Sequence, residues 1–249
     1  GGTLAEIKSG SLSAKIDFKG DITFYSVNDK QLLRNAAKFE QDVPARGYRC
    51  VRGDLFKIEA VFEPNEGEHF YGLGQEGHDR FDLKGSVIDL CQKNTKSTIP
   101  FLISTRGYGF LWNNPAIGRA ELSSNHTRWV AEAAVQLDYI VIEGTVPEIV
   151  KRYTGITGRA PALPYWATGL WQSKLRYETK EELMEAAREY KRRGLPLSMI
   201  VADYFHWPQQ GEWKFDGRFW PDPGAMVHEL DEMGIRLLVS IWPTVDPRS

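Results

Sequence analysis

Residues 198–207 read Ser198-Met-Ile-Val-Ala-Asp203-Tyr-Phe-His-Trp207, an apolar run that ends at a carboxylate among aromatic residues. A second run, Arg236-Leu-Leu-Val-Ser-Ile-Trp242-Pro243, ends in a similar way at a tryptophan. Each run predicts a short buried strand. In parallel α/β folds the C-terminal ends of the strands carry the ligand-binding residues, so Asp203 and Trp242 are candidates for a site. The alternatives are an aspartate that caps a loop or pairs with Arg or Lys, and a core tryptophan.

Helical patterns separate these strands. Thr179-Lys-Glu-Glu182 is a capping box, after which apolar residues recur on one helical face as far as Gly194. Asp222-Pro223 begins a second helix, whose predicted inner face is Met226, Val227, Leu230 and Met233. The three predicted strands are Ala167–Ser173, Leu197–Tyr204 and Arg236–Pro243. The order is therefore βαβαβ, which implies right-handed crossovers and a parallel sheet.

The length of this second part predicts an incomplete barrel. A (β/α)8 barrel takes about 250 residues, or roughly 30 for each unit. Counting from Tyr165 to Ser249 (249 − 165 + 1) leaves 85 residues, which is enough for three strands and two helices. An independent half-sheet is the alternative, but it would leave the third strand as an apolar edge. We therefore expect the first three βα units of a truncated TIM barrel.

Residues 12 to about 144 carry a different pattern, in which short strands are separated by turn-forming residues. The strand-like runs are 14–18, 56–62, Ser86–Leu90, Pro100–Thr105, Tyr108–Asn113, Arg119–Ser123, Thr127–Ala134 and Val135–Glu143. Many short strands with regular turns predict an antiparallel β-sandwich.

The two parts are joined by a helix and a linker. Thr145 is placed to cap a short helix that extends to Tyr153, with glycines following. Ala160–Pro164 contains two prolines and cannot continue that helix. The predicted domains are 1–159, a β-sandwich with a closing helix, and 160–249, the start of the barrel.

Composition excludes several classes of partner. The chain has 249 residues, a formal net charge of −2 and no dense run of Lys or Arg, so neither nucleic acid nor a membrane is expected. Eight tryptophans also suit a carbohydrate binder, because sugar faces stack on indole rings. Cys50 and Cys91 are expected to be isolated buried thiols, with a disulfide as the alternative. The sequence does not decide whether the protein forms a homo-oligomer. It also leaves the cellular compartment open, with the cytoplasm slightly favoured.

Two other motifs are weak. Gly72-Leu-Gly74-Gln-Glu-Gly77 matches a dinucleotide fingerprint, but no helical pattern follows it, so a turn between strands is the better prediction. His69, His78, Asp79 and Asp82 match no known metal-ligand spacing, which favours a solvated loop. We therefore expect no cofactor and no metal.

Among the candidate residues, Asp203 has the sequence neighbours that most favour a ligand-binding role. Nearby in the sequence are Phe205, Trp207, Trp213 and Trp220, which are expected to exclude water and strengthen its hydrogen bonds. No nucleophile elbow, phosphate-binding loop or histidine–cysteine pair appears elsewhere.

Several motifs together resemble glycoside hydrolase family 31, in the order that the family keeps. They are Phe70-Tyr-Gly-Leu-Gly74, Ile99-Pro-Phe101, Arg106-Gly-Tyr-Gly-Phe110, Gly169-Leu-Trp-Gln172, Asp203-Tyr-Phe-His-Trp207, Glu212-Trp-Lys-Phe-Asp216 and Trp220-Pro-Asp-Pro223. The resemblance implies an N-terminal β-sandwich followed by a (β/α)8 barrel. It also implies a retaining α-glycosidase with two catalytic aspartates after the third barrel strand. Neither matching motif occurs before Ser249, so no catalytic residue is assigned within this chain.

The resemblance also implies substrate-binding roles. Asp203 matches the acid that accepts hydrogen bonds from sugar hydroxyls, Tyr204 and Phe205 match residues that shape the pocket, and Trp242 matches an aromatic wall. A loop of the sandwich matches one that reaches the pocket, which makes Asp89 and Asn94 weaker candidates.

The same resemblance suggests the substrate. Trp171-Gln-Ser-Lys174, Phe205-His-Trp207 and Gly211-Glu-Trp213 are closest to the α-xylosidase branch, with α-glucosidase as the alternative. From a different class, the second hypothesis is a non-catalytic carbohydrate-binding or structural fragment. The 249-residue chain alone is expected to be inactive and prone to aggregation.

Overall fold

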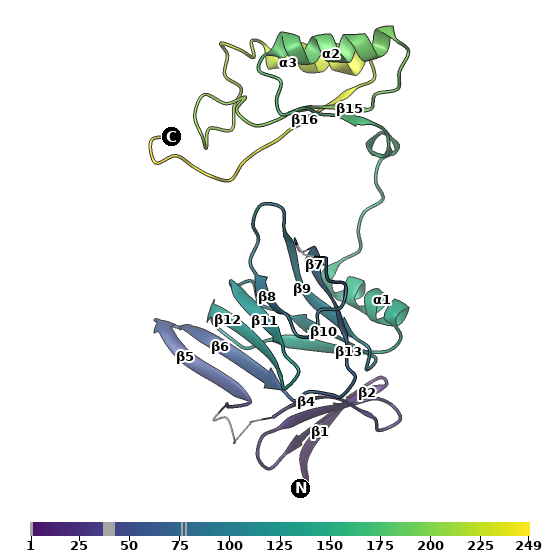
Figure 1. Cartoon of the computed structure of the whole chain (residues 1–249), viewed down its shortest axis with the longest axis vertical. Coiled ribbons are helices and arrows are strands. Elements are labelled where there is room, and N and C mark those ends of the chain that lie inside the picture. The colour runs from purple at the N-terminus through teal and green to yellow at the C-terminus, as the bar shows by residue number, and fades with distance from the viewer. Residues whose placement is uncertain (1, 37–42, 76, 78) are drawn as a thin grey trace. The chain divides into compact units, whose positions relative to one another are not determined.

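The computed structural model describes residues 2–36, 43–75, 77 and 79–249. Within it the chain forms two compact units, Gly1–Arg159 and Ala160–Ser249, and each is described by itself (Figure 1). None of the helices in the described residues has the length and apolarity that a membrane crossing requires.

The first unit consists of two antiparallel sheets. The nine-stranded sheet has the order β1-β2-β3-β4-β6-β12-β11-β8, with β5 also paired to β6, and the four-stranded sheet has the order β13-β10-β9-β7. The strands of the first are β1 Thr3–Ser9, β2 Leu12–Asp17, β3 Ile22–Tyr25, β4 Gln31–Asn35, β5 Arg46–Arg52, β6 Leu55–Phe62, β8 Val87–Leu90, β11 Gly118–Leu122 and β12 Thr127–Ala134. Those of the second are β7 Phe70–Gln75, β9 Ser97–Ser104, β10 Tyr108–Trp112 and β13 Tyr139–Glu143.

The two sheets share one aromatic core. Phe110 of the smaller sheet stacks on Trp129 of the larger one, with ring centroids 4.7 Å apart. Phe62 of β6 contacts the same Phe110 edge-to-face at 5.2 Å. All three side chains are fully buried, and each buried aromatic contributes roughly 1.5–3 kcal/mol relative to an exposed one. The sheets are therefore held together by side chains that alternate inward along their strands.

Helix α1, Val146–Thr157, packs against the smaller sheet (Figure 1). The Thr145 backbone N–H donates to Glu148 Oε2 at 2.8 Å, which satisfies one of the free donors at the helix start. Ile149 is fully buried, and Tyr153 stacks on Phe101 of β9 with ring centroids 4.0 Å apart. The helix is longer than predicted, because it continues through Gly155.

The second unit is a parallel sheet with two helices on one face (Figure 1). Its sheet has the order β14-β15-β16, and both pairings are parallel. The elements are a 3₁₀ turn at Tyr165–Thr168, β14 Trp171–Gln172, α2 Lys180–Arg192, β15 Met199–Ala202, α3 Pro223–Glu232 and β16 Arg236–Val239. The side chains buried between the sheet and the helices include Leu183, Met184, Ala187, Ile200, Ala202, Met226 and Leu230. The chain is therefore mostly β-sheet, and its second unit has the βαβαβ order expected of an α/β domain.

The strand and helix limits correct several predictions in this unit. The first strand is only Trp171–Gln172, since the 3₁₀ turn occupies part of the predicted range. The second and third strands are also shorter, ending at Ala202 and Val239. On α3, Val227 is 40% exposed and does not belong to the inner face. The Thr179 hydroxyl accepts from Glu182 N at 3.2 Å as a cap should, but the Glu182 carboxylate accepts from Glu178 N.

Predictions in the first unit also need correction. Strands β1, β3, β4, β5 and β7 were not among those predicted, and β13 begins only at Tyr139. Cys50 is exposed and Cys91 half-exposed, and both are free thiols, so the prediction of buried thiols was wrong.

The predicted turn at Gly72 and Gly74 is instead the middle of strand β7. Pairing with β9 shifts register between these glycines, whose φ angles are 121° and 92°. A Cβ on Gly74 would lie 1.9 Å from the Ser97 carbonyl oxygen, so no other residue fits this β-bulge.

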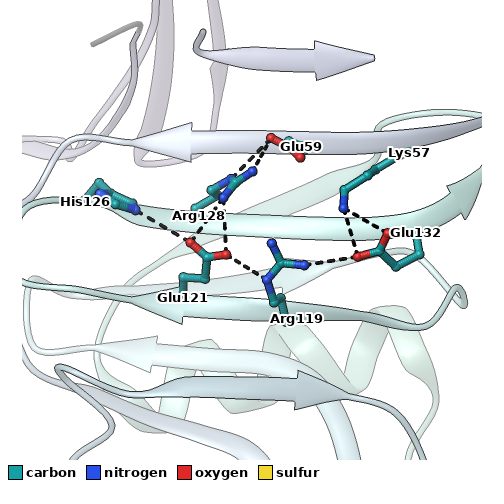
Figure 2. Close-up of polar contacts among 7 residues, drawn as sticks. All are labelled: Lys57, Glu59, Arg119, Glu121, His126, Arg128 and Glu132. Atoms are coloured by element: carbon teal, nitrogen blue, oxygen red, sulfur yellow. Dashed lines mark hydrogen bonds and ion pairs between the residues drawn. The ribbon is translucent and has the colours of Figure 1, made fainter. Parts of the chain in front are cut away.

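Opposite the core, the nine-stranded sheet carries a ladder of alternating charges (Figure 2). The Arg128 guanidinium lies 2.6 Å from the Glu59 carboxylate and 3.3 Å from that of Glu121. The Arg119 guanidinium lies 2.7 Å from the Glu121 carboxylate and 3.0 Å from that of Glu132. At one end of the ladder Lys57 Nζ lies 3.0 Å from the Glu132 carboxylate, and at the other end His126 Nε2 lies 3.7 Å from that of Glu121. The members come from β6, β11, β12 and the turn before β12.

Candidate functional site

Asp203 directly follows β15, as predicted, and is half-buried. Its Oδ1 accepts a hydrogen bond from the Tyr204 backbone N–H at 2.8 Å. Among the described residues no Arg or Lys forms an ion pair with this carboxylate, and Oδ2 has no hydrogen-bond donor. One oxygen of Asp203 thus caps its own turn, and the other can accept hydrogen bonds from a ligand.

An aromatic platform lies beside this carboxylate. Tyr204 and Trp242 are stacked with ring centroids 5.3 Å apart and planes 10° from parallel. Phe205 lies 4.6 Å from Tyr204 and 6.5 Å from Trp242, again between ring centroids. Trp242 is 42% exposed and Phe205 49%, so these rings offer apolar surface to solvent. The structure therefore brings together four predicted site residues, Asp203, Tyr204, Phe205 and Trp242.

The aromatic residues around Asp203 divide into two groups. Trp207 and Trp220 are buried, as expected for side chains that exclude water, whereas Phe205 and Trp213 are exposed. Trp213 nevertheless donates its Nε1–H to the Trp242 carbonyl oxygen at 3.2 Å. The prediction that all four exclude water was thus wrong for two of them.

His206 supports the turn from beneath. Its Nδ1 lies 3.0 Å from the Asp203 carbonyl oxygen, which can only accept, so Nδ1 carries the proton. The ring is 3% exposed, and burial lowers the pKa of this histidine despite the hydrogen bond to Asp203 and the charge of its carboxylate. His206 is therefore a neutral ring that fixes the backbone of Asp203. This role could not be predicted from the sequence, in which only the position of His206 in the run after Asp203 points to it.

The segments flanking the platform are tied to each other. The Asp246 backbone N–H donates to the Gln210 carbonyl oxygen at 2.9 Å. Gly211, the residue after Gln210, has a φ of 98°, and a Cβ added to it would lie 2.9 Å from Val245 Cα. This close approach requires glycine and holds the loop after β15 against the segment after β16. The indole N–H of Trp207 and the amide N of Gln210 are buried without a partner in the described residues.

Asp89 and Asn94 belong to the first unit. Asp89 is an exposed residue of β8, whose carbonyl oxygen accepts a hydrogen bond from Lys96 Nζ. Asn94 is exposed in the turn between β8 and β9. Their role in the sugar site stays a prediction.

The residues considered for a metal do not gather into a site. His69 Nδ1 lies 2.6 Å from Asp82 Oδ2, and both side chains are exposed. Asp79 is exposed, and His78 falls outside the described residues. In the part of the chain that the structure describes, no three His, Cys, Asp or Glu side chains form a group that could hold a metal ion.

Comparison with known families matches both units. The model of the glycosyl hydrolase 31 N-terminal galactose mutarotase-like domain matches residues 2–119. The model of the glycosyl hydrolases family 31 TIM-barrel domain matches residues 160–249. The fold thus comprises the N-terminal domain of this family and the start of its TIM-barrel domain.

Individual relatives agree with these matches. A family 31 glucosidase of Pseudescherichia vulneris, itself uncharacterized, is 43% identical over 98% of this chain and 50% of its own length. An α-xylosidase of Saccharolobus solfataricus is 40% identical over 76% of this chain and 28% of its own. The crystal structure of an α-xylosidase of the same family from a soil metagenome, complexed with xylose, is 46% identical with a TM-score of 0.89, covering 98% of this chain and 39% of that one. The chain thus spans half or less of the length of these relatives, and it belongs to glycoside hydrolase family 31.

Proposed function

We propose that this chain is the N-terminal portion of a retaining α-glycosidase that removes a terminal non-reducing α-linked sugar, with α-xylosides favoured. The observation that carries the proposal is the free oxygen of Asp203 beside the stacked rings of Tyr204 and Trp242. The relatives named α-xylosidase, and the related structure that holds xylose, support this choice of sugar.

The proposed binding mode follows from the chemistry of these groups. The Asp203 carboxylate accepts hydrogen bonds from sugar hydroxyls, and the exposed face of Trp242 packs against the apolar face of the ring. A sugar that lacks those hydroxyls leaves the carboxylate without partners, at a cost of about 1–3 kcal/mol or more. Asp203, Tyr204, Phe205 and Trp242 are the proposed binding residues, with Asp89 and Asn94 as further candidates from the first unit.

Preference for xylose over glucose is proposed to rest on bulk. Xylose lacks the hydroxymethyl group that glucose carries, and aromatic side chains next to Asp203 would fill the space that group needs. Phe205 is the closest exposed ring in the sequence. An α-glucosidase of the same family is the alternative, and it requires room at this position.

The proposed domains are 1–159, a β-sandwich closed by helix α1, and 160–249, the first three βα units of a (β/α)8 barrel. The two carboxyls that break the bond in a retaining enzyme are about 5 Å apart. We assign neither of them to residues within this chain. Its part in catalysis is to bind and orient the sugar, and a carbohydrate-binding fragment is the second candidate function.

The deciding experiment compares two nitrophenyl glycosides in the full-length product of the gene. We expect a higher kcat/KM for 4-nitrophenyl α-xyloside than for the α-glucoside, and a loss of at least 100-fold in the Asp203→Asn variant. Arg192→Met, on the exposed surface of α2, is the matched control and should retain activity. A preference for the glucoside would favour the alternative, and activity on neither substrate would leave only the binding function, measurable by calorimetry with xylose.

A further inference from the structure

Phe205 combines an exposed ring with an unfavourable backbone. Its φ of 59° is rare for any residue other than glycine, and its side chain is 49% exposed. Burial of the ring therefore does not account for this conformation. The surrounding structure must hold Phe205 in place, and the contacts of its ring identify how.

Three aromatic rings and one cation contact the Phe205 ring. The ring centroids of Tyr204, Trp207 and Trp242 lie 4.6, 5.9 and 6.5 Å away. The guanidinium carbon of Arg176 lies 5.8 Å from the Phe205 centroid, within the range of a cation–π interaction. Arg176 comes from the loop after β14, so the loops after all three strands meet at this ring.

The loop that carries Arg176 is fastened on both sides by one carboxylate. Glu182, in the first turn of α2, accepts the Glu178 backbone N–H on Oε2 at 2.8 Å and the Lys174 ammonium on Oε1. Lys174 and Glu178 each lie two residues from Arg176. Glu178 also lies 3.9 Å from the Arg176 guanidinium. These contacts restrict where the guanidinium can lie.

We propose that Arg176 is a positioning residue, which fixes the Phe205 ring at the edge of the sugar site and thereby enforces selection for the smaller sugar. The proposal rests on the proposed function for the identity of that sugar. Its physical basis does not, because the guanidinium limits the motion of an exposed ring whether or not a ligand is bound. The Glu182 carboxylate contributes to the same positioning indirectly, because it holds the loop that carries Arg176.

The first test observes Phe205 directly in the full-length protein. A single 4-fluorophenylalanine at position 205 reports ring environment through its ¹⁹F resonance. We expect Arg176→Met, which keeps the aliphatic stem and removes the charge, to shift and broaden this resonance. Glu182→Gln should do so to a smaller extent, and Arg192→Met should leave it unchanged. An unchanged resonance in Arg176→Met would overturn the proposal, even if the protein cleaved no glycoside.

The second test measures selectivity in the same variants. We expect Arg176→Met to lower the kcat/KM ratio of α-xyloside to α-glucoside at least fivefold, and Arg176→Lys, which retains a cation, to restore most of it. A ratio within twofold of the wild type in Arg176→Met would overturn the positioning role. Wild-type protein inactive on both substrates would instead contradict the proposed function, and the ¹⁹F resonance would still decide the role of Arg176.

Discussion

Tyr204 and Trp242 stack almost in parallel, and they do so because the strands before them pair. Strands β15 and β16 run in register, with Ala202 opposite Val239, and the Ser240 backbone N–H donates to the Ala202 carbonyl oxygen at 3.0 Å. The segments that follow β15 and β16 therefore leave the sheet side by side. The platform is a consequence of parallel pairing, and it forms only when both strands are in place.

Replacing Trp242 tests the platform. We expect Trp242→Leu to weaken xylose binding about tenfold, since loss of aromatic stacking removes roughly 0.5–1.5 kcal/mol beyond the lost contact area. Calorimetric titration of the full-length protein with xylose measures this change. Trp166→Leu is the matched control, because Trp166 in the 3₁₀ turn is also 42% exposed. An equal loss in both variants would contradict a specific role for Trp242.

The buried His206 predicts an acid sensitivity of the site. Burial lowers its pKa, so in the native state the ring protonates only below its ordinary pKa of about 6.5. The stability that it contributes is therefore complete above that pH and is lost as pH falls through the folded-state pKa. We expect urea unfolding between pH 7.5 and 5 to show this loss, and a histidine NMR titration to give the lowered pKa directly.

Two substitutions separate this histidine from others. His206→Gln should lower stability at pH 7.5 and remove part of the pH dependence. His228→Gln should change neither, because His228 is an exposed side chain of α3. An unaltered pH slope in His206→Gln would show that another group is responsible.

The positions of the site residues were easier to predict from the sequence than the backbone angles, contacts and strand limits around them. Asp203 and Trp242 were correctly placed near strand ends, because short apolar runs that stop at a polar or aromatic residue are a local signal. The φ of Phe205 and the approach of Arg176 were not predictable, since both depend on contacts between segments distant in the sequence. Strand β14 was predicted too long for a related reason. Apolar residues from Ala167 onward fit a strand or a 3₁₀ turn equally well, and tertiary packing chooses between them.

The same limit applies to the glycines of β7. Closely spaced glycines such as Gly72, Gly74 and Gly77 predict a turn from composition alone. Here the partner strand β9 passes so close that its Ser97 carbonyl oxygen occupies the place of a Cβ on Gly74. That proximity is a property of the paired sheet, which a single strand does not reveal.

A pair of alanine substitutions tests this bulge. Gly74→Ala should destabilise the first unit by about 3 kcal/mol or more, because its φ is 92° and its Cβ would overlap backbone atoms of Ser97 and Ile99. Gly155→Ala lies within α1 with nothing within 4 Å of the added Cβ, so it should stabilise by about 0.5–1 kcal/mol. Urea unfolding measures both, and opposite signs are the expected outcome.

The charge ladder of Figure 2 predicts a pH-dependent contribution to stability. Burial would raise the pKa of Glu121, but Arg119 and Arg128 outweigh it and hold that pKa below its ordinary value. A carboxyl with a lowered folded-state pKa stabilises the fold above about pH 4.5, and this stabilisation is lost as pH falls through the folded-state pKa. The ladder should therefore be fully effective at neutral pH and lost in acid.

Arg128→Met isolates the ladder. Arg128 bridges Glu59 and Glu121 while half-buried, so its loss should lower the free energy of unfolding by about 1–2 kcal/mol at pH 7. As pH falls toward 3 the difference from the wild type should shrink, because the stabilisation that depends on the lowered pKa of Glu121 is lost in acid. Arg49→Met is the control, an exposed arginine of β5 expected to change stability by less than about 0.5 kcal/mol. A difference that persisted undiminished at pH 3 would assign the effect of Arg128 to packing of its aliphatic stem, since packing does not depend on carboxylate charge.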